Sequence, residues 1–248
     1  NQMVTYLSYF KNLPRVYLLD IEGTTTSISF VYDVLFPYAA AAAPAYIAEQ
    51  WDQLAEVRSL YWSQVLADRA AGSVLLPGVT ESSFDISHMQ ELTASFMAAD
   101  RKLTCLKQLQ GELWRTGYLT GELQGHVYAD VPLAFERWTS SGARIAIYSS
   151  GSVAAQRLLF GHSVHGDLRS FLCAHFDTRT GAKTDSQSYA RIAIELDCSV
   201  EEIVFATDKL AEAEAASTAG LQAIILNRPG NALNAPNAFR SVEDFYAL

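Results

Sequence analysis

Two carboxylates stand one residue apart where an apolar segment near the N-terminus gives way to a turn. Asp20 and Glu22 follow Tyr17-Leu18-Leu19 and precede Gly23-Thr24-Thr25-Thr26. A carboxylate in a poorly solvated position costs several kcal/mol unless it is paired or bound to a metal ion. This placement favours either a nucleophile with an acid–base partner or a metal site.

Three other segments carry residues suited to binding a phosphorylated molecule. Ser149 and Ser150, followed by Gly151-Ser152, open a predicted helix at 152–160. Hydroxyls and backbone N–H groups at a helix N-terminus form a natural phosphate cradle. Asp208 lies in Thr207-Asp208-Lys209, and Lys183 ends the run Gly181-Ala182-Lys183.

The charges of these groups distinguish between the possible chemistries. Asp20, Asp208 and a phosphate would place three anions in one crevice, and each like-charge pair repels by about 4 kcal/mol at ~4 Å and an effective dielectric near 20. Such a site needs a divalent cation, and oxygen ligands favour Mg²⁺. With Lys183 neutralising the remaining phosphate charge, the pattern predicts phosphoryl transfer to Asp20, with Glu22 as the acid and base.

The elements that must position these residues read as a parallel sheet. Four short apolar segments predict buried strands at Arg15–Ile21, Ala143–Tyr148, Glu202–Ala206 and Leu221–Leu226. Helical patterns at Ser186–Leu196, with Asp185 or Ser186 as the N-cap, and at Leu210–Gly220 alternate with the strands. We therefore expect an α/β fold with a Rossmann-like parallel sheet covered by helices on both faces, whose strand ends meet at one edge.

The spacing between the strands is broken once. Between Ile21 and Ala143 lie 121 residues, whereas a strand–helix–strand unit needs only about 30. Helical patterns in this segment predict an inserted helical cap domain at residues 31–129. The catalytic core is then expected at residues 14–30 and 130–248, with residues 1–13 as an N-terminal extension.

Composition limits the partners. The net charge of −9 and the pI near 5.0 provide no basic surface for nucleic acid. Three scattered cysteines indicate a reducing compartment, and no apolar run reaches about 18 residues, the length needed to span a membrane. We expect a cytoplasmic monomer that acts on a small phosphorylated molecule, with no nucleic-acid or membrane partner.

The order Asp20-Ile21-Glu22-Gly23-Thr24, Ser149, Lys183 and Asp208 resembles the four motifs of the haloacid dehalogenase-like phosphatases. More narrowly, the chain resembles the enolase-phosphatase family of methionine salvage over about residues 15–245. The segments that carry this resemblance include Leu35-Phe36-Pro37-Tyr38-Ala39, Leu106-Lys107-Gln108-Leu109-Gln110-Gly111, Gly125-His126-Val127-Tyr128 and Arg228-Pro229-Gly230-Asn231.

The resemblance implies a substrate, a cofactor and a set of site residues. The substrate is 2,3-diketo-5-methylthiopentyl 1-phosphate, which is enolised and then dephosphorylated to an acireductone. Asp20, the Glu22 backbone carbonyl and Asp208 would hold Mg²⁺, while Ser149, Ser150 and Lys183 would bind the phosphate. The chain departs from the family pattern at Lys209 beside the metal ligand, and at Glu214, where relatives usually have Asp.

Several alternatives remain open from sequence. The protein could be a Mg²⁺-dependent phosphatase or mutase acting on ordinary sugar phosphates, or a catalytically silent phosphate-binding module. Glu212 could be an acidic charge at a helix N-terminus or a group that supports the site. His126 and Tyr128 could touch the substrate, whereas the pair His162 and His165 is expected to be structural or on the surface.

Overall fold

The computed structural model describes residues 14–248 and divides them into two units. Unit 1 comprises the described residues up to Val31 together with Gln124–Leu248, and unit 2 is Tyr32–Leu123. The expected extension, residues 1–13, lies outside the described residues. The expected cap, residues 31–129, contains all of unit 2, but residue 31 and residues 124–129 belong to unit 1.

Unit 1 is built on a six-stranded sheet in which every neighbouring pair is parallel, with the order β3-β2-β1-β4-β5-β6. Its strands are β1 (Val16–Leu19), β2 (Arg144–Tyr148), β3 (Leu172–Phe176), β4 (Ile203–Thr207), β5 (Gln222–Leu226) and β6 (Arg240–Val242). The predicted α/β fold with a parallel sheet is confirmed. Two of the strands, β3 and β6, were not predicted, because β3 is only partly buried and β6 has three residues.

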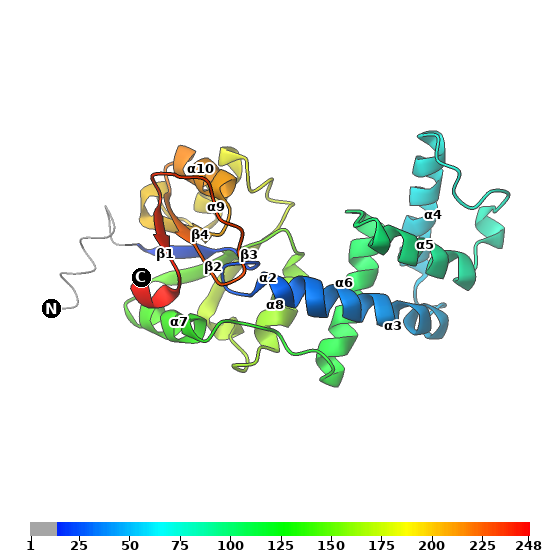
Figure 1. Cartoon of the computed structure of the whole chain (residues 1–248), viewed down its shortest axis with the longest axis horizontal. Helices are drawn as coiled ribbons and strands as arrows, with labels where there is room; N and C mark the ends of the chain where they lie inside the picture. The colour runs from blue at the N-terminus through cyan, green and yellow to red at the C-terminus, as the bar shows by residue number, and fades with distance from the viewer. Residues whose placement is uncertain (1–13) are drawn as a thin grey trace. The chain divides into compact units, whose positions relative to one another are not determined.

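Helices cover both faces of this sheet. Figure 1 shows two of them on one face and two on the other: α7 (Asp130–Ser140) and α8 (Val153–Gly161), then α9 (Ser186–Glu195) and α10 (Leu210–Thr218). Side chains of β1 alternate between the faces, as the period of a strand requires. Val16 and Leu18 share a core with Tyr189 of α9, whereas Tyr17 stacks on Trp138 of α7 with ring centroids 3.8 Å apart.

Side-chain caps explain where two helices near the strand ends begin. The Ser152 hydroxyl accepts a hydrogen bond from the Ala155 N–H at 3.2 Å and starts α8. The Asp185 carboxylate accepts from the Gln187 N–H at 2.9 Å and starts α9, which identifies Asp185 as the N-cap. Such caps satisfy backbone donors that have no partner within the helix.

Unit 2 is helical. Its helices are α3 (Phe36–Glu49), α4 (Ala55–Ala70), α5 (Ile86–Ala98) and α6 (Thr104–Thr120), with a short 3-10 helix, η2 (Glu81–Ser83). Leu54, Val57, Tyr61 and Val65, which recur at helical spacing in the sequence, are buried in the core of this unit. Unit 1 has three further 3-10 helices, η3 (Arg169–Phe171), η4 (Val200–Glu202) and η5 (Phe245–Ala247).

One helical run meets the length and hydropathy criteria for crossing a membrane. It extends over Ile28–Glu49, 22 residues, through the short α2 (Ile28–Phe30), a π-helical turn η1 (Val31–Leu35) and α3. Core helices and signal sequences meet the same criteria. Ala39, Ala43 and Ile47 of this run are buried in the core of unit 2, and 22% of the apolar window is buried in all.

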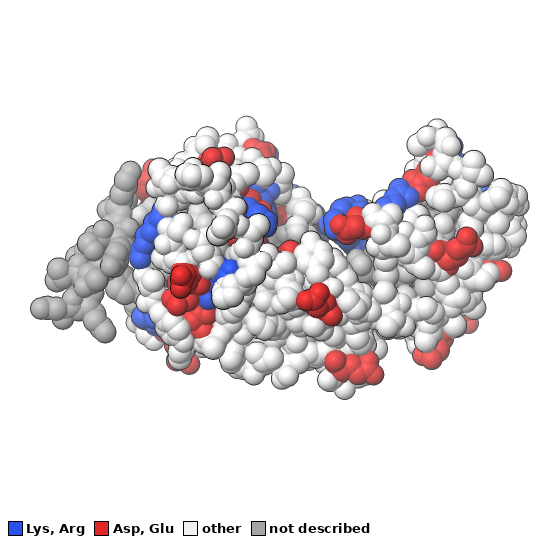
Figure 2. All heavy atoms as spheres, in the orientation of Figure 1, with Lys and Arg blue, Asp and Glu red and all other residues white. Residues whose placement is uncertain are grey.

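Charged side chains are interspersed on the face of the molecule drawn in Figure 2. Acidic and basic groups lie beside one another among mostly uncharged residues. The acidic balance of the chain therefore shows on this face as scattered carboxylates rather than as one acidic patch.

Candidate active site

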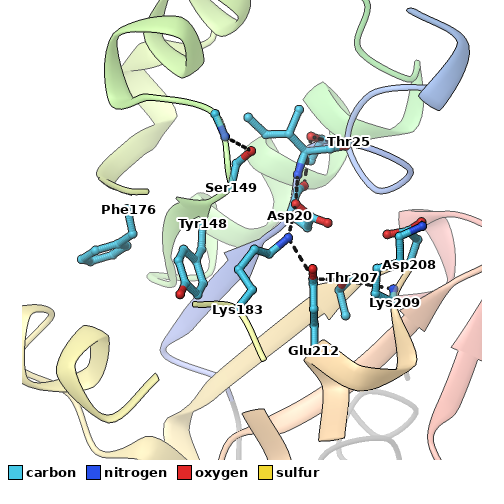
Figure 3. A network of polar contacts seen from close by, with 12 residues as sticks. Asp20, Thr25, Tyr148, Ser149, Phe176, Lys183, Thr207, Asp208, Lys209 and Glu212 are labelled. Carbon is cyan, nitrogen blue, oxygen red and sulfur yellow. Dashed lines mark hydrogen bonds and ion pairs between the residues drawn. The ribbon is translucent and has the colours of Figure 1, made fainter. Parts of the chain in front are cut away.

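The carboxyl ends of three neighbouring strands carry the residues predicted to do chemistry. Asp20 follows β1 directly, Ser149 follows β2, and Asp208 follows β4. β1 lies between β2 and β4, so these three side chains emerge at one edge of the sheet. Figure 3 shows them around the amine of Lys183, which reaches in from the loop before α9.

Lys183 joins two carboxylates, the buried Asp20 and the partly buried Glu212. Its Nζ lies 2.7 Å from Asp20 Oδ1 and 2.8 Å from Glu212 Oε2. Glu212 is held in place by the Thr207 hydroxyl, which donates to the same Oε2 at 2.6 Å. The Lys183 carbonyl accepts from the Tyr189 hydroxyl at 2.6 Å, so the loop that carries this lysine is tied to α9.

Burial is the largest influence on the pKa values of Asp20 and Lys183. Desolvation raises the pKa of Asp20 to about 7, against the opposing charge of Lys183 and with a further contribution from Glu212. Burial lowers the pKa of Lys183, but the charges of Asp20 and Glu212 outweigh it and the net direction is upward. Lys183 is therefore a cation whose charge is shared between two acids.

The turn after Asp20 is locked by its own backbone. The Ile21 carbonyl accepts from the N–H groups of Thr24, Thr25 and Thr26 at 2.9–3.1 Å. The Asp20 Oδ1 accepts from the Ile21 N–H at 2.7 Å, which orients the carboxylate. The three threonines are fully buried, so the turn presents a pre-organised Asp20 at the strand end.

The loop after β2 presents hydroxyl and N–H groups. Ser149 is buried and its Oγ accepts from the Gly151 N–H at 3.2 Å, while Ser150 is exposed. Gln156 supports the loop from below, since its Nε2 donates to the Gly151 carbonyl at 2.9 Å and to the Phe176 carbonyl at 2.8 Å. This arrangement suits an anion at the start of α8.

Asp208 is buried and only partly satisfied. Lys209 Nζ lies 2.8 Å from its Oδ2, but its Oδ1 is buried without a hydrogen-bond partner. Burial raises the pKa of Asp208, against the hydrogen bond from Lys209. The Asn234 amide donates to the Asp208 carbonyl at 2.9 Å and thereby holds the backbone at this position.

The residues around Asp208 fit a divalent cation. Gly23 has a φ of +75°, and a Cβ there would lie 2.8 Å from Asp208 Cγ and 3.0 Å from Asn231 Oδ1. Asn231 donates through Nδ2 to the Gly23 and Leu226 carbonyls, and its Oδ1 is a second buried oxygen without a partner. Buried oxygens that lack donors, beside a position that only glycine can occupy, are what a hard cation requires.

The cation ligands implied by the resemblance include only two side chains. Within residues 14–248, no three or more His, Cys, Asp and Glu side chains form a group that could hold a metal ion. The set implied by the resemblance has only two side-chain carboxylates, Asp20 and Asp208. The resemblance takes the third donor from a backbone group, the Glu22 carbonyl.

The structure thus brings Asp20, Lys183 and Glu212 into direct contact. It places Ser149 and Asp208 at the ends of the two strands that flank β1. Glu22 is partly buried in the turn, where its backbone forms an isolated β-bridge with that of Thr26. The catalytic, phosphate-binding and metal-binding roles assigned to Asp20, Glu22, Ser149, Ser150, Lys183 and Asp208 all stay predictions.

The histidines weighed from sequence have contacts of their own. His126 accepts from the Ser27 N–H through Nδ1 at 3.1 Å, and its carbonyl accepts from the Thr26 hydroxyl at 2.8 Å. It therefore supports the turn after Asp20. His165 Nε2 lies 3.0 Å from the Val127 carbonyl, a contact with the backbone.

Sequence reasoning left the role of Glu212 open, named Asn231 only within a segment that carries the resemblance, and missed Asn234. The sequence leaves two roles open for Glu212, a charge at a helix N-terminus or a group that supports the site. Its position four residues after Asp208, on the first turn of α10, places both carboxylates on one side of the helix start. For the two asparagines no spacing rule was available, because they lie in the irregular segment after β5.

Comparison with known proteins defines the class. A model of the haloacid dehalogenase-like hydrolase family matches residues 14–220. The chain belongs to this family of hydrolases, in agreement with the sheet and with the order of residues at its strand ends. Membership implies a divalent cation in the site.

The more similar relatives narrow the class further. The chain is 46% identical over 245 residues to enolase-phosphatase E1 of Drosophila melanogaster, covering 98% of this chain and 95% of the relative. It is 48% identical to enolase-phosphatase E1 of Drosophila mojavensis, with 94% of each protein covered. Within the family, the chain is therefore a member of the enolase-phosphatase group.

A solved structure supports the same fold. The UTR4 protein of Saccharomyces cerevisiae superposes with a TM-score of 0.77 at 33% identity. The match covers 95% of this chain and 100% of that one.

Proposed function

We propose that this protein is a bifunctional enolase-phosphatase that converts 2,3-diketo-5-methylthiopentyl 1-phosphate into the acireductone and phosphate in methionine salvage. Near-full-length identity of 46–48% to enolase-phosphatases supports the assignment. The observation that carries the chemistry is the contact between Asp20 and Lys183 at the carboxyl end of the sheet.

In the first half-reaction an Asp20 carboxylate oxygen attacks the phosphorus. The bond between Asp20 and phosphorus forms as the ester P–O bond breaks, and Glu22 gives a proton to the leaving oxygen. In the second half-reaction Glu22 takes a proton from water as the water oxygen attacks the phosphorus of the phosphoaspartate. Asp20 is then released as a carboxylate together with inorganic phosphate.

Binding of the phosphoryl group falls to the residues around Asp20. We assign Ser149, Ser150 and Lys183 to the phosphate oxygens, because hydroxyls, the start of α8 and an ammonium group converge there. Mg²⁺ would be held by the Asp20 carboxylate, the Glu22 carbonyl and Asp208. When bound, it supplies charge neutralisation for the attacking carboxylate and the phosphate.

The decisive experiment is a turnover assay with the diketo phosphate, with and without Mg²⁺. Acireductone absorbance and phosphate release are followed in parallel, and a panel of sugar phosphates is the control. We expect both products from the diketo phosphate only when Mg²⁺ is present. Turnover of the sugar phosphates alone would remove the methionine-salvage assignment and leave an ordinary phosphatase.

We further propose a cytoplasmic monomer that acts on a small phosphorylated substrate, without nucleic-acid or membrane partners. The three cysteines, Cys105, Cys173 and Cys198, are free thiols, as expected in a reducing compartment. Light scattering on the purified protein tests the monomer, and a mass twice that of the 27.2 kDa chain would contradict it.

A further inference from the structure

Lys209 lies directly after Asp208 and turns its amine back onto that carboxylate. Its Nζ lies 2.8 Å from Asp208 Oδ2, and its side chain is 53% exposed whereas that of Asp208 is 2% exposed. The backbone of Lys209 is fixed, since its N–H donates to the Thr207 hydroxyl at 3.1 Å and its carbonyl accepts from the Ala213 N–H at 3.1 Å. The backbone is thus held at the start of α10, while the side chain is about half exposed; Figure 3 shows Lys209 beside Asp208.

The surroundings of this amine are acidic. The charges of Asp208, Glu22 and Asp20 all act on the Lys209 amine. Two of these three carboxylates, Asp20 and Asp208, are assigned to the divalent cation. Asp208 Oδ1 has no hydrogen-bond partner, so Lys209 satisfies only half of that carboxylate.

We propose that Lys209 is a built-in counter-cation that occupies Asp208 when no divalent cation is bound and thereby sets the cation affinity of the site. This inference rests on the proposed function, because it takes Asp208 as a cation ligand. An ammonium group and a divalent cation repel each other and compete for the same carboxylate. Binding of the divalent cation therefore requires the amine to leave Asp208, which its exposure permits.

Lys183 provides the internal contrast. Its side chain is only 12% exposed, and two carboxylates hold it at 2.7 and 2.8 Å. Lys183 is therefore a fixed cation within the site, whereas Lys209 is a replaceable one at its rim.

The test is a calorimetric titration of Mg²⁺ into the substrate-free protein. We expect Lys209→Gln to bind Mg²⁺ about tenfold more tightly than the unaltered protein, because the competing charge is gone. Lys209→Arg keeps the charge and should bind Mg²⁺ within about twofold of the unaltered protein. The matched control is Lys102→Gln in unit 2, which removes the same charge from an exposed pair with Asp100 at 2.6 Å and should leave the affinity unchanged.

A second measurement uses stability as the readout. Saturating Mg²⁺ should raise the melting midpoint of Lys209→Gln by more than it raises that of the unaltered protein, since tighter binding gives a larger stabilisation. Melting curves also verify that every variant is folded.

Two results would overturn the inference while leaving turnover of the diketo phosphate in place. The first is Mg²⁺ affinity of Lys209→Gln equal to that of the unaltered protein. The second is Lys209→Arg binding as tightly as Lys209→Gln, which would show that charge is not the cause. If the unaltered protein bound no Mg²⁺ and turned over no diketo phosphate, the proposed function would fail together with the inference.

Discussion

Unit 1 contains two groups of buried charged side chains, one around Asp20 and Asp208 and the other around Arg228 and Asp130. Both lie next to the turn that follows β1, and both pair acids with bases. They differ in how completely their polar atoms are satisfied. We call them the strand-end cluster (Asp20, Lys183, Asp208, Lys209 and Glu212) and the anchor pair (Arg228 and Asp130).

In the anchor pair every charge is matched. Arg228 donates to both oxygens of Asp130 at 2.9 and 2.8 Å, and its Nε donates to the Thr24 carbonyl at 2.9 Å. Asp130 Oδ2 also accepts from the Phe245 N–H at 2.6 Å. The guanidinium lies 4.2 Å from the centre of the Tyr128 ring. One acid and one base thus tie the turn to segments far apart in the sequence.

In the strand-end cluster acids outnumber bases. Asp20, Asp208 and Glu212 face the two amines of Lys183 and Lys209, and Asp208 Oδ1 has no donor. Burial raises the pKa of Asp20 to about 7 because its charge is not fully compensated. The contrast shows how a structural ion pair differs from a reactive site. In the structural pair all charges and polar atoms have partners within the protein, whereas the reactive site keeps charges and polar atoms that a ligand can satisfy.

The largest expected effect breaks the chemistry of the strand-end cluster without breaking the fold. Asp20→Asn should lower hydrolysis by about 10³-fold or more, because an amide oxygen cannot form the phosphoaspartate. Phosphate release from the diketo phosphate measures it. The melting midpoint should stay at or above that of the unaltered protein, since a poorly compensated buried charge is removed. Turnover within tenfold of the unaltered protein would exclude the covalent route.

The anchor pair should behave in the opposite way. Arg228→Met leaves Asp130 as an uncompensated buried charge and should lower the free energy of unfolding by about 3–5 kcal/mol. Denaturant titration measures this loss. In the double variant Arg228→Met, Asp130→Asn no buried charge is left, and the loss should be smaller than the sum of the two single losses. Additive losses would show that the pair is not coupled.

Lys183 sharpens the comparison, because it is a buried base that serves binding. Lys183→Ala should weaken inhibition by inorganic phosphate about 10- to 100-fold in the presence of Mg²⁺, since a charge-assisted contact is lost. Its melting midpoint should change less than that of Arg228→Met, because Asp20 can take up a proton when its partner is removed. Inhibition constants and melting curves on the same samples test the claim. A large fall in melting midpoint with unchanged phosphate inhibition would make Lys183 a structural residue.

The features that could be predicted from sequence are those set by short segments of chain, and the features that could not depend on contacts between residues far apart in the sequence. Asp20, Ser149 and Asp208 were predicted together because parallel strands place their carboxyl ends at one edge, and the apolar strands are visible in the sequence. Lys183 was predicted from its place in the motif order.

The remaining features depend on contacts that no local pattern encodes. Glu212 meets Lys183 across 29 positions of chain, and Asn231 reaches Gly23 across 208. β3 was missed because its partly exposed sequence, Leu172–Phe176, includes a histidine and a cysteine and lacks the apolar run of a central strand. Arg228 belongs to a segment that carries the resemblance. Its pairing with Asp130, 98 positions away in the sequence, could not be predicted from that segment.

The smallest expected effect concerns His175, which belongs to neither group and provides a baseline. His175 lies in β3 opposite Ile147, and its Nδ1 is 3.1 Å from the Gln156 Oε1. Burial, followed by the charge of Arg157, lowers the pKa of His175 to about 4. The unfolded chain therefore takes up a proton at higher pH than the folded protein does. Stability from this group is complete above the unfolded pKa of about 6.5 and is lost as the pH falls toward about 4.

The corresponding loss should be about 1–2 kcal/mol after allowance for solvent screening of a partly exposed side chain. Denaturant unfolding between pH 8 and pH 4 measures it, and His175→Gln should show a shallower fall than the unaltered protein. An unchanged slope in His175→Gln would show that His175 is not the source of the acid sensitivity. Asp20 and Asp208 would not explain it either, because their raised pKa values favour the folded protein as the pH falls.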